Sequence, residues 1–495
     1  MQRPLDLEPI GCFQDRFKLR NYGMKSSKEK YLRVIKSFCL VTLLSLCCAM
    51  TAQFSVGCNY GLLVTNVRTG HVIAQHNADV CFTPASITKL ITTATAIEML
   101  GPDFRFSTLI ATDVPLADSV LPGNLYIVGG GDPTLGSDYI GDPRFMAQWC
   151  QMLQDKGIRR ITGSVIADAS CFDRNAVPGG WTWEDMGNYY GAGAYGISVY
   201  DNTLRVTLRS KADGMQPQII AVAPQVPGLI IDNRLIARNN SGDNAYFYGM
   251  PFDNRRIVCG TIPANAAHFT IRGDIPNPPL LVAQQLTDAL RTAGIIVDGE
   301  PYDCYTPSTL SDTLFVVQSP ALAEIIKETN YHSINFFAEH LLKCIALQRD
   351  SIGANTDTAI AILKDFWCYR GIDLTTLHLI DGSGLSPQNA FTPRVLNDIL
   401  CYMYTRSPYA EIFYESLPVA GESGTVRNLF KKTSLAGRAH LKSGSMRRVQ
   451  CYAGYIESGD ATYAITVMVN NFSDARSTLR KQIEKMVLDA VSEQR

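Results

Sequence analysis

The chain has 495 residues, enough for more than one hydrophobic core at roughly 100–200 residues per domain. Its composition, 46% hydrophobic and 18% charged, excludes an intrinsically disordered protein, which would lack the apolar surface that offsets the entropy of ordering. The formal net charge of -1 argues against nucleic acid as a partner of the folded body.

The first 52 residues differ in composition from the rest. A basic run at 25–36 precedes an apolar stretch at 38–52, and this order is typical of a secretory signal peptide. We therefore expect an exported protein, periplasmic or in the cell envelope, cleaved near Ala52. A buried helix or a membrane anchor is the alternative, but the stretch is shorter than the ~20 residues of a membrane span. Residues 1–23 look out of place before such a signal, so Met24 is a candidate start; no later run predicts a transmembrane span.

The cysteines bear on disulfides and metals. Ten of the 14 follow residue 52, and export would permit disulfides. Cys58 and Cys81 flank a predicted hairpin, with strands at 61–67 and 71–75, and are candidates for a pair; buried free thiols are the equal alternative. The chain has no C-x-x-C pair and no Cys/His cluster with zinc spacing, so we expect neither a metal nor a cofactor.

The predicted elements follow an α/β, β-rich, α/β order. A helix is expected over 84–100, since Pro84 stands near its start and Gly101 at its end. From about 108 to 320 short strands dominate, expected at 124–128, 160–167, 203–208, 218–223, 255–262 and 268–271, with one helix at 145–153. Later come helices at 322–329, 333–347, 359–367, 394–404 and 479–491, and strands at 450–456 and 461–469. A core domain split by a long insertion and three domains in line both fit this order.

The first chemical motif is Ser86-x-x-Lys89, at the start of the first helix. Residues at i and i+3 share a helix face, so the lysine nitrogen can reach the serine oxygen. A serine hydroxyl is a weak nucleophile until a base takes its proton, and a lysine can serve if burial disfavours its charged form. Alone the motif is weak, because a capping serine followed by a surface lysine gives the same spacing.

Two later motifs give the first one a context. Ser333-Ile-Asn335 begins a predicted helix, and Lys442-Ser443-Gly444 opens a predicted edge strand that continues to Ile456. Each is common alone. In this order they match the serine, S-x-N and K-[TS]-G set of penicillin-recognising enzymes.

Longer segments make the resemblance specific. Residues 84–92, 127–135, 381–386 and 416–425, together with the K-S-G segment, resemble the D-alanyl-D-alanine carboxypeptidase/endopeptidase family of class C low-molecular-mass penicillin-binding proteins, peptidase family S13. The resemblance covers about residues 59–490. The family has K-T-G as its usual third motif; here Ser443 keeps the hydroxyl.

The resemblance implies an α/β fold, a β-lactamase/transpeptidase-like core with two β-rich domains inserted between the S-x-x-K and S-x-N motifs. The interval of 333 − 86 = 247 residues between the two serines has room for them. The expected division is a leader and signal peptide at 1–52, core at 53–107, insertion at 108–320 with its outer part at roughly 172–262, and core again at 321–495.

The resemblance also implies residue roles. Ser86 would attack the D-Ala-D-Ala carbonyl and form an acyl-enzyme, with Lys89 as base and Asn335 orienting Lys89. Ser333 and Lys442 would relay the proton to the leaving amine. Water would then cleave the acyl-enzyme, so that the whole reaction removes terminal D-Ala or cuts a D-Ala–diaminopimelate crosslink. The implied partners are therefore peptidoglycan stem peptides and crosslinks. β-Lactams would be inhibitors that stay bound, because no dedicated deacylation carboxylate is evident.

Further implied contacts concern substrate binding. The backbone N–H groups of Ser86 and Ser445 would form the oxyanion hole, and Ser443 and Gly444 would border the substrate. Asp168 matches an acidic position that binds a side-chain amine in relatives; a turn-forming Asp is its alternative. Pro387 stands where relatives commonly carry an arginine that binds a diaminopimelate carboxylate, so that contact must come from elsewhere or be absent.

Two rival functions stay open at this point. A serine β-lactamase or esterase on the same core would need a device for fast deacylation, such as a glutamate that activates water. A non-catalytic peptidoglycan-binding relative would be favoured by loss of a catalytic residue, and all five are present.

Overall fold

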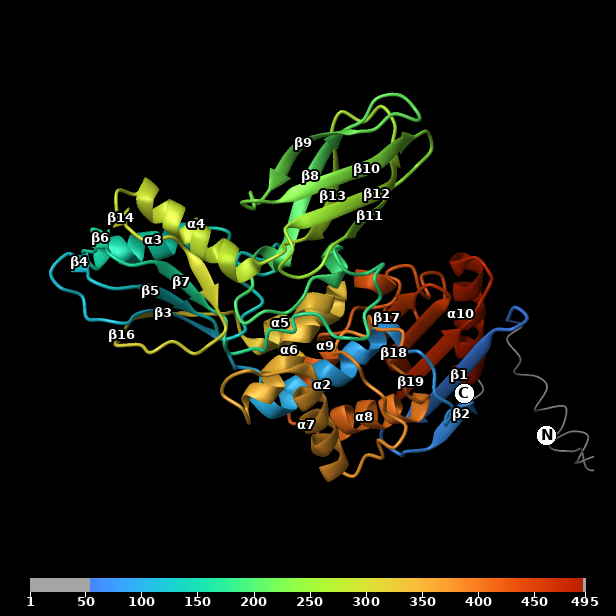
Figure 1. Ribbon diagram of the computed structural model, residues 1–495. Coiled ribbons are helices and arrows are strands. Elements are labelled where there is room, and N and C mark those ends of the chain that lie inside the picture. Colours follow the sequence, from blue (N-terminus) through green and yellow to red (C-terminus); the bar gives the residue numbers. More distant parts are fainter. Residues whose placement is uncertain (1–53, 493–495) are drawn as a thin grey trace, which may run out of the picture. The chain divides into compact units, whose positions relative to one another are not determined.

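The computed structural model describes residues 54–492 (Figure 1). The expected signal peptide and the candidate start at Met24 lie outside these residues. No helix between residues 54 and 492 combines the length and the apolar character needed to cross a bilayer.

The core sheet joins the two ends of the described chain. Its five antiparallel strands run in the order β17-β18-β19-β1-β2. They are β17 (Ala439–Met446), β18 (Val449–Ser458), β19 (Ala461–Asn470), β1 (Asn59–Asn66) and β2 (Val72–His76). Because β1 pairs directly with β19, the α/β patterns before and after the β-rich stretch belong to one core, as expected for a split domain.

Helices cover both faces of this sheet. Cys451, Ala453 and Tyr455 alternate along β18 and face a helical layer, as the two-residue period of a strand requires. That layer contains η1 (Ala85–Ile87), α2 (Thr88–Leu100), α5 (Leu322–His332), α6 (Asn335–Leu347), α7 (Thr356–Tyr369), α8 (Pro393–Thr405) and α9 (Ala410–Glu415). Helix α10 (Arg476–Ser492) lies on the opposite side of the sheet (Figure 1). Helix α2 is buried at every residue from Thr88 to Ile97, so it is the centre of the helical layer.

A second five-stranded sheet is formed by the insertion. Its order is β15-β7-β5-β3-β16, from β15 (Tyr302–Cys304), β7 (Val165–Asp168), β5 (Leu125–Val128), β3 (Ser107–Thr112) and β16 (Asp312–Gln318). Two helices pack together beside it, α3 (Phe145–Asp155) and α4 (Pro278–Thr292). A small sheet completes this part, with β14 (Ile296–Val297), β6 (Arg160–Ile161) and β4 (Val120–Leu121).

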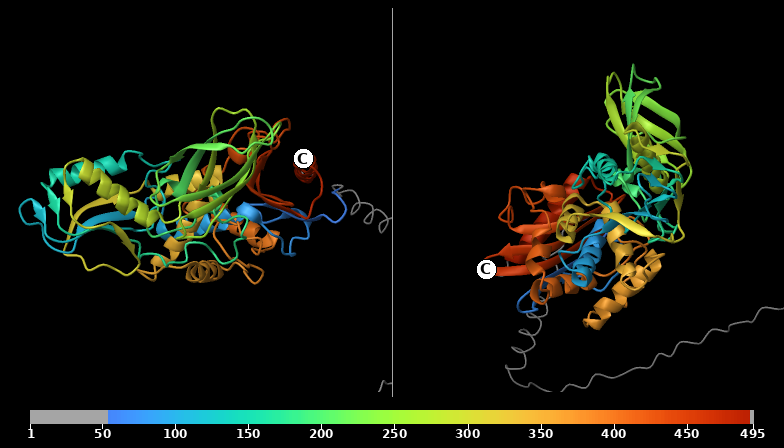
Figure 2. Two further views of the ribbon diagram at one scale, coloured as in Figure 1. Left: turned by 45° about the horizontal axis from the view of Figure 1, so that its top comes forward. Right: turned by 90° about the vertical axis from the view of Figure 1, so that its left-hand side faces the viewer.

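Two three-stranded sheets form the β lobe, which we define as residues 203–274. One contains β10 (Ile230–Arg238), β12 (Arg255–Pro263) and β11 (Asn244–Tyr248). The other contains β13 (Phe269–Asp274), β8 (Thr203–Arg209) and β9 (Gln218–Ala223). Buried side chains such as Val206 and Val258 join the sheets in one core. The two sheets lie next to each other in the lobe (Figures 1 and 2). The lobe is carried between β7 and α4, so it is an insertion within the insertion.

The structure corrects several expectations about the helices and strands. Residues 442–456 are not one strand but parts of β17 and β18, because Arg448 adopts a left-handed φ of 61° and turns the chain. The strand expected at 160–167 is interrupted, giving β6 and β7. Helix α4 was not expected in the β-rich stretch, although Asn277 caps it and Pro278 occupies its first turn, which is a common start signal.

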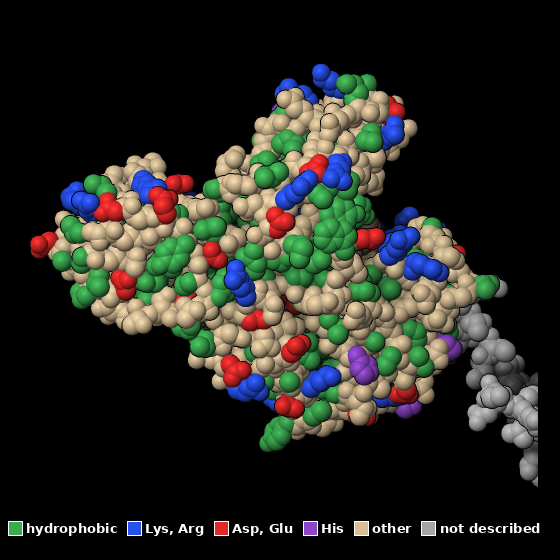
Figure 3. All heavy atoms as spheres, in the orientation of Figure 1, with side chains coloured by type: hydrophobic (Ala, Val, Ile, Leu, Met, Phe, Trp, Pro, Cys, Tyr) green, Lys and Arg blue, Asp and Glu red, His purple; other side chains and the backbone are tan. Residues whose placement is uncertain are grey.

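The cysteines among residues 54–492 form no disulfide bonds. All ten cysteines of the described chain are free thiols, including Cys58 and Cys81, so the candidate pair is not bridged. Acidic and basic side chains are interspersed over the face shown in Figure 3.

Candidate active site

The nucleophile candidate sits where the first helix begins. Ser86 lies in η1, directly before α2, and Ala85 before it adopts a left-handed φ of 49°. Gly444 of β17 approaches this turn so closely that a Cβ there would lie 3.0 Å from the Ser86 nitrogen and 2.6 Å from the Pro84 oxygen. The glycine of K-S-G is therefore required by the contact between β17 and the serine turn.

Lys89 faces Ser86 from one turn along α2. Its Nζ donates to Ser86 Oγ at 3.0 Å, to Asn335 Oδ1 at 2.5 Å and to the Ser383 carbonyl oxygen at 2.6 Å. The side chain is completely buried. Burial lowers the pKa of Lys89 to about 7, although the charges of Asp381 and Glu339 oppose this. Near pH 7 a substantial fraction of the Lys89 side chains is therefore neutral, and a neutral lysine can accept the proton of the serine hydroxyl.

Two buried carboxylates support the loop that contacts Lys89. Glu339 accepts from the backbone N–H groups of Gly382 at 3.1 Å and Ser383 at 2.8 Å. Asp381 accepts from two further N–H groups of the same loop, and also from Trp181 Nε1 at 2.9 Å. Burial raises the pKa of both carboxyls. Their oxygens are engaged in holding the loop rather than turned toward Ser86.

The second lysine completes the site. Lys442 Nζ donates to Ser333 Oγ at 2.7 Å and to the carbonyl oxygen of Ser443 at 2.7 Å. Ser333 stands between α5 and α6 with a left-handed φ of 60°. Burial, together with the charge of Lys89, holds the pKa of Lys442 well below its ordinary value. The structure thus brings together Ser86, Lys89, Ser333, Asn335 and Lys442, the five residues singled out in the sequence.

A cavity of about 320 Å³ opens over these groups, and we call it the catalytic cleft. Its lining includes Ser443 and Ser445, which the sequence had singled out, and further polar residues that it had not. The lining residues are Ser86, Ser333, Thr425, Ser443, Ser445, Gln450 and Tyr452. Thr425 accepts a hydrogen bond from Ser443 Oγ at 2.8 Å.

Some contacts were not identified from the sequence. Thr425 and Ser383 lie in segments that carried the family resemblance. The sequence therefore showed where they stand in the chain, but not which residues they contact. Glu339 follows Asn335 by four residues on α6, a spacing that places both on one helix face. Gln450 bonds Ser445 Oγ at 3.3 Å, and no local pattern marked it.

Asp168 lies apart from the catalytic cleft lining. It ends β7, is 1% exposed, and its two oxygens accept from the backbone N–H groups of Ser170 at 3.0 Å and Ser308 at 2.8 Å. These bonds fix a turn and a loop. A role for Asp168 in binding a side-chain amine stays a prediction. Pro387 is exposed.

Comparison with known proteins gives consistent matches. The family model "D-Ala-D-Ala carboxypeptidase 3 (S13) family" matches residues 49–490. The chain is similar to a D-alanyl-D-alanine carboxypeptidase of Actinomadura sp. (strain R39), 29% identical over 83% of this chain and 78% of the relative. It is also similar to the D-alanyl-D-alanine carboxypeptidase DacB of Haemophilus influenzae, 24% identical over 86% of this chain and 88% of the relative.

A solved structure shows the same fold. Penicillin binding protein 4 (dacB) from Haemophilus influenzae superposes with a TM-score of 0.78 at 24% identity, covering 89% of this chain and 98% of that chain. Since the family model spans nearly all of the residues that form the core sheet, the helical layer and the insertion, this chain belongs to the D-Ala-D-Ala carboxypeptidase 3 (S13) family.

Proposed function

We propose that this protein is a serine-type DD-peptidase that cleaves the D-Ala–D-Ala bond of peptidoglycan stem peptides through an acyl-enzyme on Ser86. The observation that carries the proposal is the contact between Lys89 Nζ and Ser86 Oγ at 3.0 Å, with the lysine fully buried. Nucleophile and base are within proton-transfer reach before substrate binds. Family membership supports the substrate class.

Acylation begins with Ser86 Oγ. Lys89 takes its proton as the oxygen attacks the carbonyl carbon of the penultimate D-Ala. Asn335 and the Ser383 carbonyl hold Lys89 Nζ in line, since both accept from it. These fixed acceptors preserve the orientation of the base during proton transfer.

The leaving group departs on the side of Ser333. The 2.7 Å bond from Lys442 Nζ to Ser333 Oγ supports a relay in which Ser333 protonates the amine of terminal D-Ala and recovers a proton from Lys442. The terminal carboxylate of the substrate fits among the hydroxyls of Thr425 and Ser443 in the catalytic cleft. Its negative charge favours the protonated form of Lys442.

The developing oxyanion needs donors next to Ser86. The backbone N–H groups of Ser86 and Ser445 are assigned this role, supported by the close approach of Gly444 to the Ser86 turn. The intervening Gly444 allows β17 to border the bound peptide without steric obstruction.

β-Lactams act on the same residues. A relative of known structure, penicillin binding protein 4 from Haemophilus influenzae, was solved with a β-lactam bound. Here the carboxylates of Glu339 and Asp381 accept backbone N–H groups, an arrangement that supports slow deacylation rather than β-lactamase turnover. The acyl-enzyme formed with a β-lactam is therefore long-lived. Cleavage of D-Ala–diaminopimelate crosslinks proceeds by the same acylation of Ser86 as release of D-Ala, and water then hydrolyses the peptidyl acyl-enzyme.

The experiment compares wild type with Ser86→Ala. Wild type releases D-Ala from a peptide ending in D-Ala-D-Ala and is labelled by a fluorescent penicillin, whereas Ser86→Ala does neither. Ser55→Ala, which changes a serine outside the lining of the catalytic cleft, is the matched control. Undiminished labelling of Ser86→Ala contradicts the assignment, and rapid multiple turnover of nitrocefin by wild type would favour a β-lactamase instead.

Location and domain division complete the proposal. Export through a signal peptide ending near Ala52 places the enzyme in the periplasm or cell envelope, where its substrate is. The core comprises 53–107 and 321–495, and the insertion comprises 108–320. The β lobe at 203–274 supports an outer insertion that both begins and ends later along the chain than the expected 172–262.

A further inference from the structure

A second cavity adjoins the catalytic cleft. It has a volume of about 260 Å³ and shares Ser333 with the cleft, so the two are neighbours. Asn335 lines it as well. Three further lining residues belong to the insertion, and they are Tyr139, Tyr189 and Arg272. We call this cavity the insertion subsite.

Arg272 is the available cation of the insertion subsite. Its guanidinium carbon lies 3.7 Å from the ring centroid of Tyr189, and its side chain is exposed. The ion pairs formed within residues 54–492 do not include Arg272. The guanidinium also hydrogen-bonds the side chain of Tyr139, a neutral partner that leaves its positive charge uncompensated. A guanidinium has five N–H donors, so those not used by Tyr139 can still receive a planar anion.

The acids of the insertion subsite are already engaged. Asp138 forms an ion pair with Arg205. Asp201 accepts from Ser137 Oγ at 2.5 Å and from the Asp138 N–H at 3.1 Å, and it attracts Arg272 without a direct ion pair. The subsite therefore presents an exposed guanidinium between aromatic walls, with its carboxylates committed to other donors.

Other cations do not compete for this role. His332, the last residue of α5, also lines the subsite. Its Nε2 lies 3.3 Å from a carboxylate oxygen of Glu328. Arg272 is thus the group with capacity for an incoming anion.

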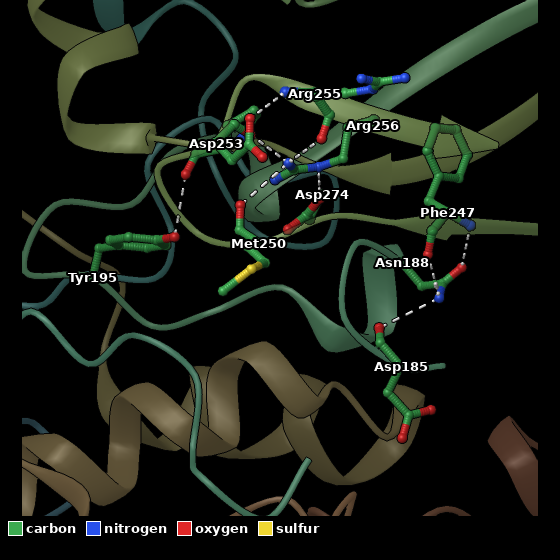
Figure 4. A network of polar contacts seen from close by, with 10 residues as sticks. Asp185, Asn188, Tyr195, Phe247, Met250, Asp253, Arg255, Arg256 and Asp274 are labelled. Carbon is green, nitrogen blue, oxygen red and sulfur yellow. Dashed lines mark hydrogen bonds and ion pairs between the residues drawn. The ribbon is translucent and has the colours of Figure 1, made fainter. Parts of the chain in front are cut away.

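A buried polar network fixes the walls of the subsite (Figure 4). Asn188, 3% exposed, donates to the Phe247 carbonyl at 3.1 Å and accepts from the Phe247 N–H at 3.0 Å. Tyr189 is the next residue, so the β lobe sets its position. Asp274, two residues after Arg272 on β13, pairs at 2.5 Å with the fully buried Arg256.

The wall of the insertion subsite that contains Tyr189 and Tyr190 is also hydrogen-bonded to Asn335 of the catalytic cleft region. Asn335 Nδ2 donates to the Tyr190 carbonyl at 2.8 Å, while its Oδ1 accepts from Lys89. A single carboxamide therefore stands between the catalytic base and the insertion subsite. On the other side of Ser333, the hydroxyls of the catalytic cleft suit the carboxylate of the leaving residue.

We propose that the insertion subsite binds a carboxylate on the acyl part of the substrate, upstream of the scissile bond, with Arg272 as its partner. The inference rests on the proposed function. With the leaving D-Ala in the catalytic cleft, the chain upstream of the carbonyl passes Asn335 and enters the subsite. A planar carboxylate there accepts two parallel N–H groups from the guanidinium, while the chain bearing it packs on Tyr139 and Tyr189.

The test uses two peptides ending in D-Ala-D-Ala that differ at one upstream group, a carboxylate in one and its carboxamide in the other. The measured quantity is kcat/KM for D-Ala release. We expect wild type to prefer the carboxylate peptide roughly tenfold, as a charge-assisted bond allows. Arg272→Gln removes most of this preference by raising KM for the carboxylate peptide, and Arg272→Lys keeps part of it.

Arg238→Gln is the matched control. Arg238 belongs to the same lobe, is half exposed and pairs with Asp213 away from the subsite. We expect it to keep the wild-type preference. Melting temperatures verify that each variant is folded.

Three outcomes would overturn the inference. Wild type could cleave both peptides equally, Arg272→Gln could keep the full preference, or the preference could follow an added sugar rather than the carboxylate, since tyrosines also stack on sugars. If wild type releases D-Ala from neither peptide and Ser86 is not labelled by penicillin, the proposed function itself fails. Release of D-Ala without carboxylate preference leaves that function intact.

Discussion

Glu339 accepts the backbone N–H of Ser383 at 2.8 Å, and the carbonyl of Ser383 accepts from Lys89 at 2.6 Å. The carboxylate is 1% exposed and lies beneath the loop, out of hydrogen-bonding contact with Ser86. In the proposed mechanism Glu339 acts on the base indirectly, by fixing the carbonyl that holds Lys89 in line with Ser86. Glu339 is a positioning residue in this arrangement.

The first prediction concerns Glu339→Gln. The amide places an N–H where the loop presents its own N–H groups, and a buried donor left unsatisfied costs about 1–3 kcal/mol. We expect the rate constant for acylation by a fluorescent penicillin to fall roughly tenfold or more. The charge of Glu339 raises the pKa of Lys89, so its removal also moves the midpoint of the pH profile to lower pH.

The control for this prediction is Glu411→Gln, at an exposed position in the first turn of α9. It should leave rate and midpoint unchanged. A folded Glu339→Gln protein with the wild-type rate and midpoint would show that the loop positions its carbonyl without the carboxylate.

The second prediction concerns pH. Lys89 accepts the serine proton only when neutral, and burial lowers its pKa to about 7. Below that pH the protonated lysine dominates, and above it the neutral base does. We therefore expect the acylation rate constant to rise with pH, with a midpoint at about 7. Rates measured from about pH 5 to about pH 9 test this, and a flat profile would exclude Lys89 as the titrating base.

The third prediction uses Gly444→Ala. A Cβ at this position would lie 3.0 Å from the Ser86 nitrogen and 2.6 Å from the Pro84 oxygen, so β17 and the serine turn must move apart. A misplacement of about 1 Å costs roughly 100-fold in rate. We expect a similar loss of acylation in a protein that remains folded.

Gly242→Ala is its control, because no atom lies within 4 Å of a Cβ at that position. It should label like wild type. Wild-type labelling of Gly444→Ala would mean that β17 does not border the nucleophile as described.

The fourth prediction concerns the attachment of the insertion to the core. Lys343 of α6, whose side chain is 2% exposed, donates to Asp173 Oδ1 at 2.7 Å and to the Asn175 carbonyl at 2.9 Å. Removal of one partner of a buried pair leaves an uncompensated charge, which costs about 3–5 kcal/mol. We expect Asp173→Ala to be destabilised by about 3 kcal/mol, measured by urea unfolding.

The comparison variant is Asp350→Ala. Its partner Arg349 is 61% exposed, and exposed pairs contribute about 0–1 kcal/mol. Equal unfolding midpoints for the two variants would show that the Lys343 contact adds nothing to stability.

Local patterns predicted the chemistry and most of the elements. Ser86 and Lys89 were paired correctly in space because a helix places residues three apart on one face. Strand β9 and helix α8 followed from periodicity and turn residues. Helix α4 was missed because its neighbourhood was interpreted as β-rich, although Asn277 and Pro278 marked its start.

The sequence by itself determined which groups are the candidates for the chemistry, since the residue types and the order of Ser86, Ser333 and Lys442 along the chain are read without coordinates. Only the tertiary structure decided that these groups meet, that Glu339 supports the loop around Lys89, and that Arg272 borders the second cavity. Local spacing reports contacts within one helix or strand. Contacts between elements more than 100 residues apart depend on which faces pack together, and that is set by the burial of the whole chain.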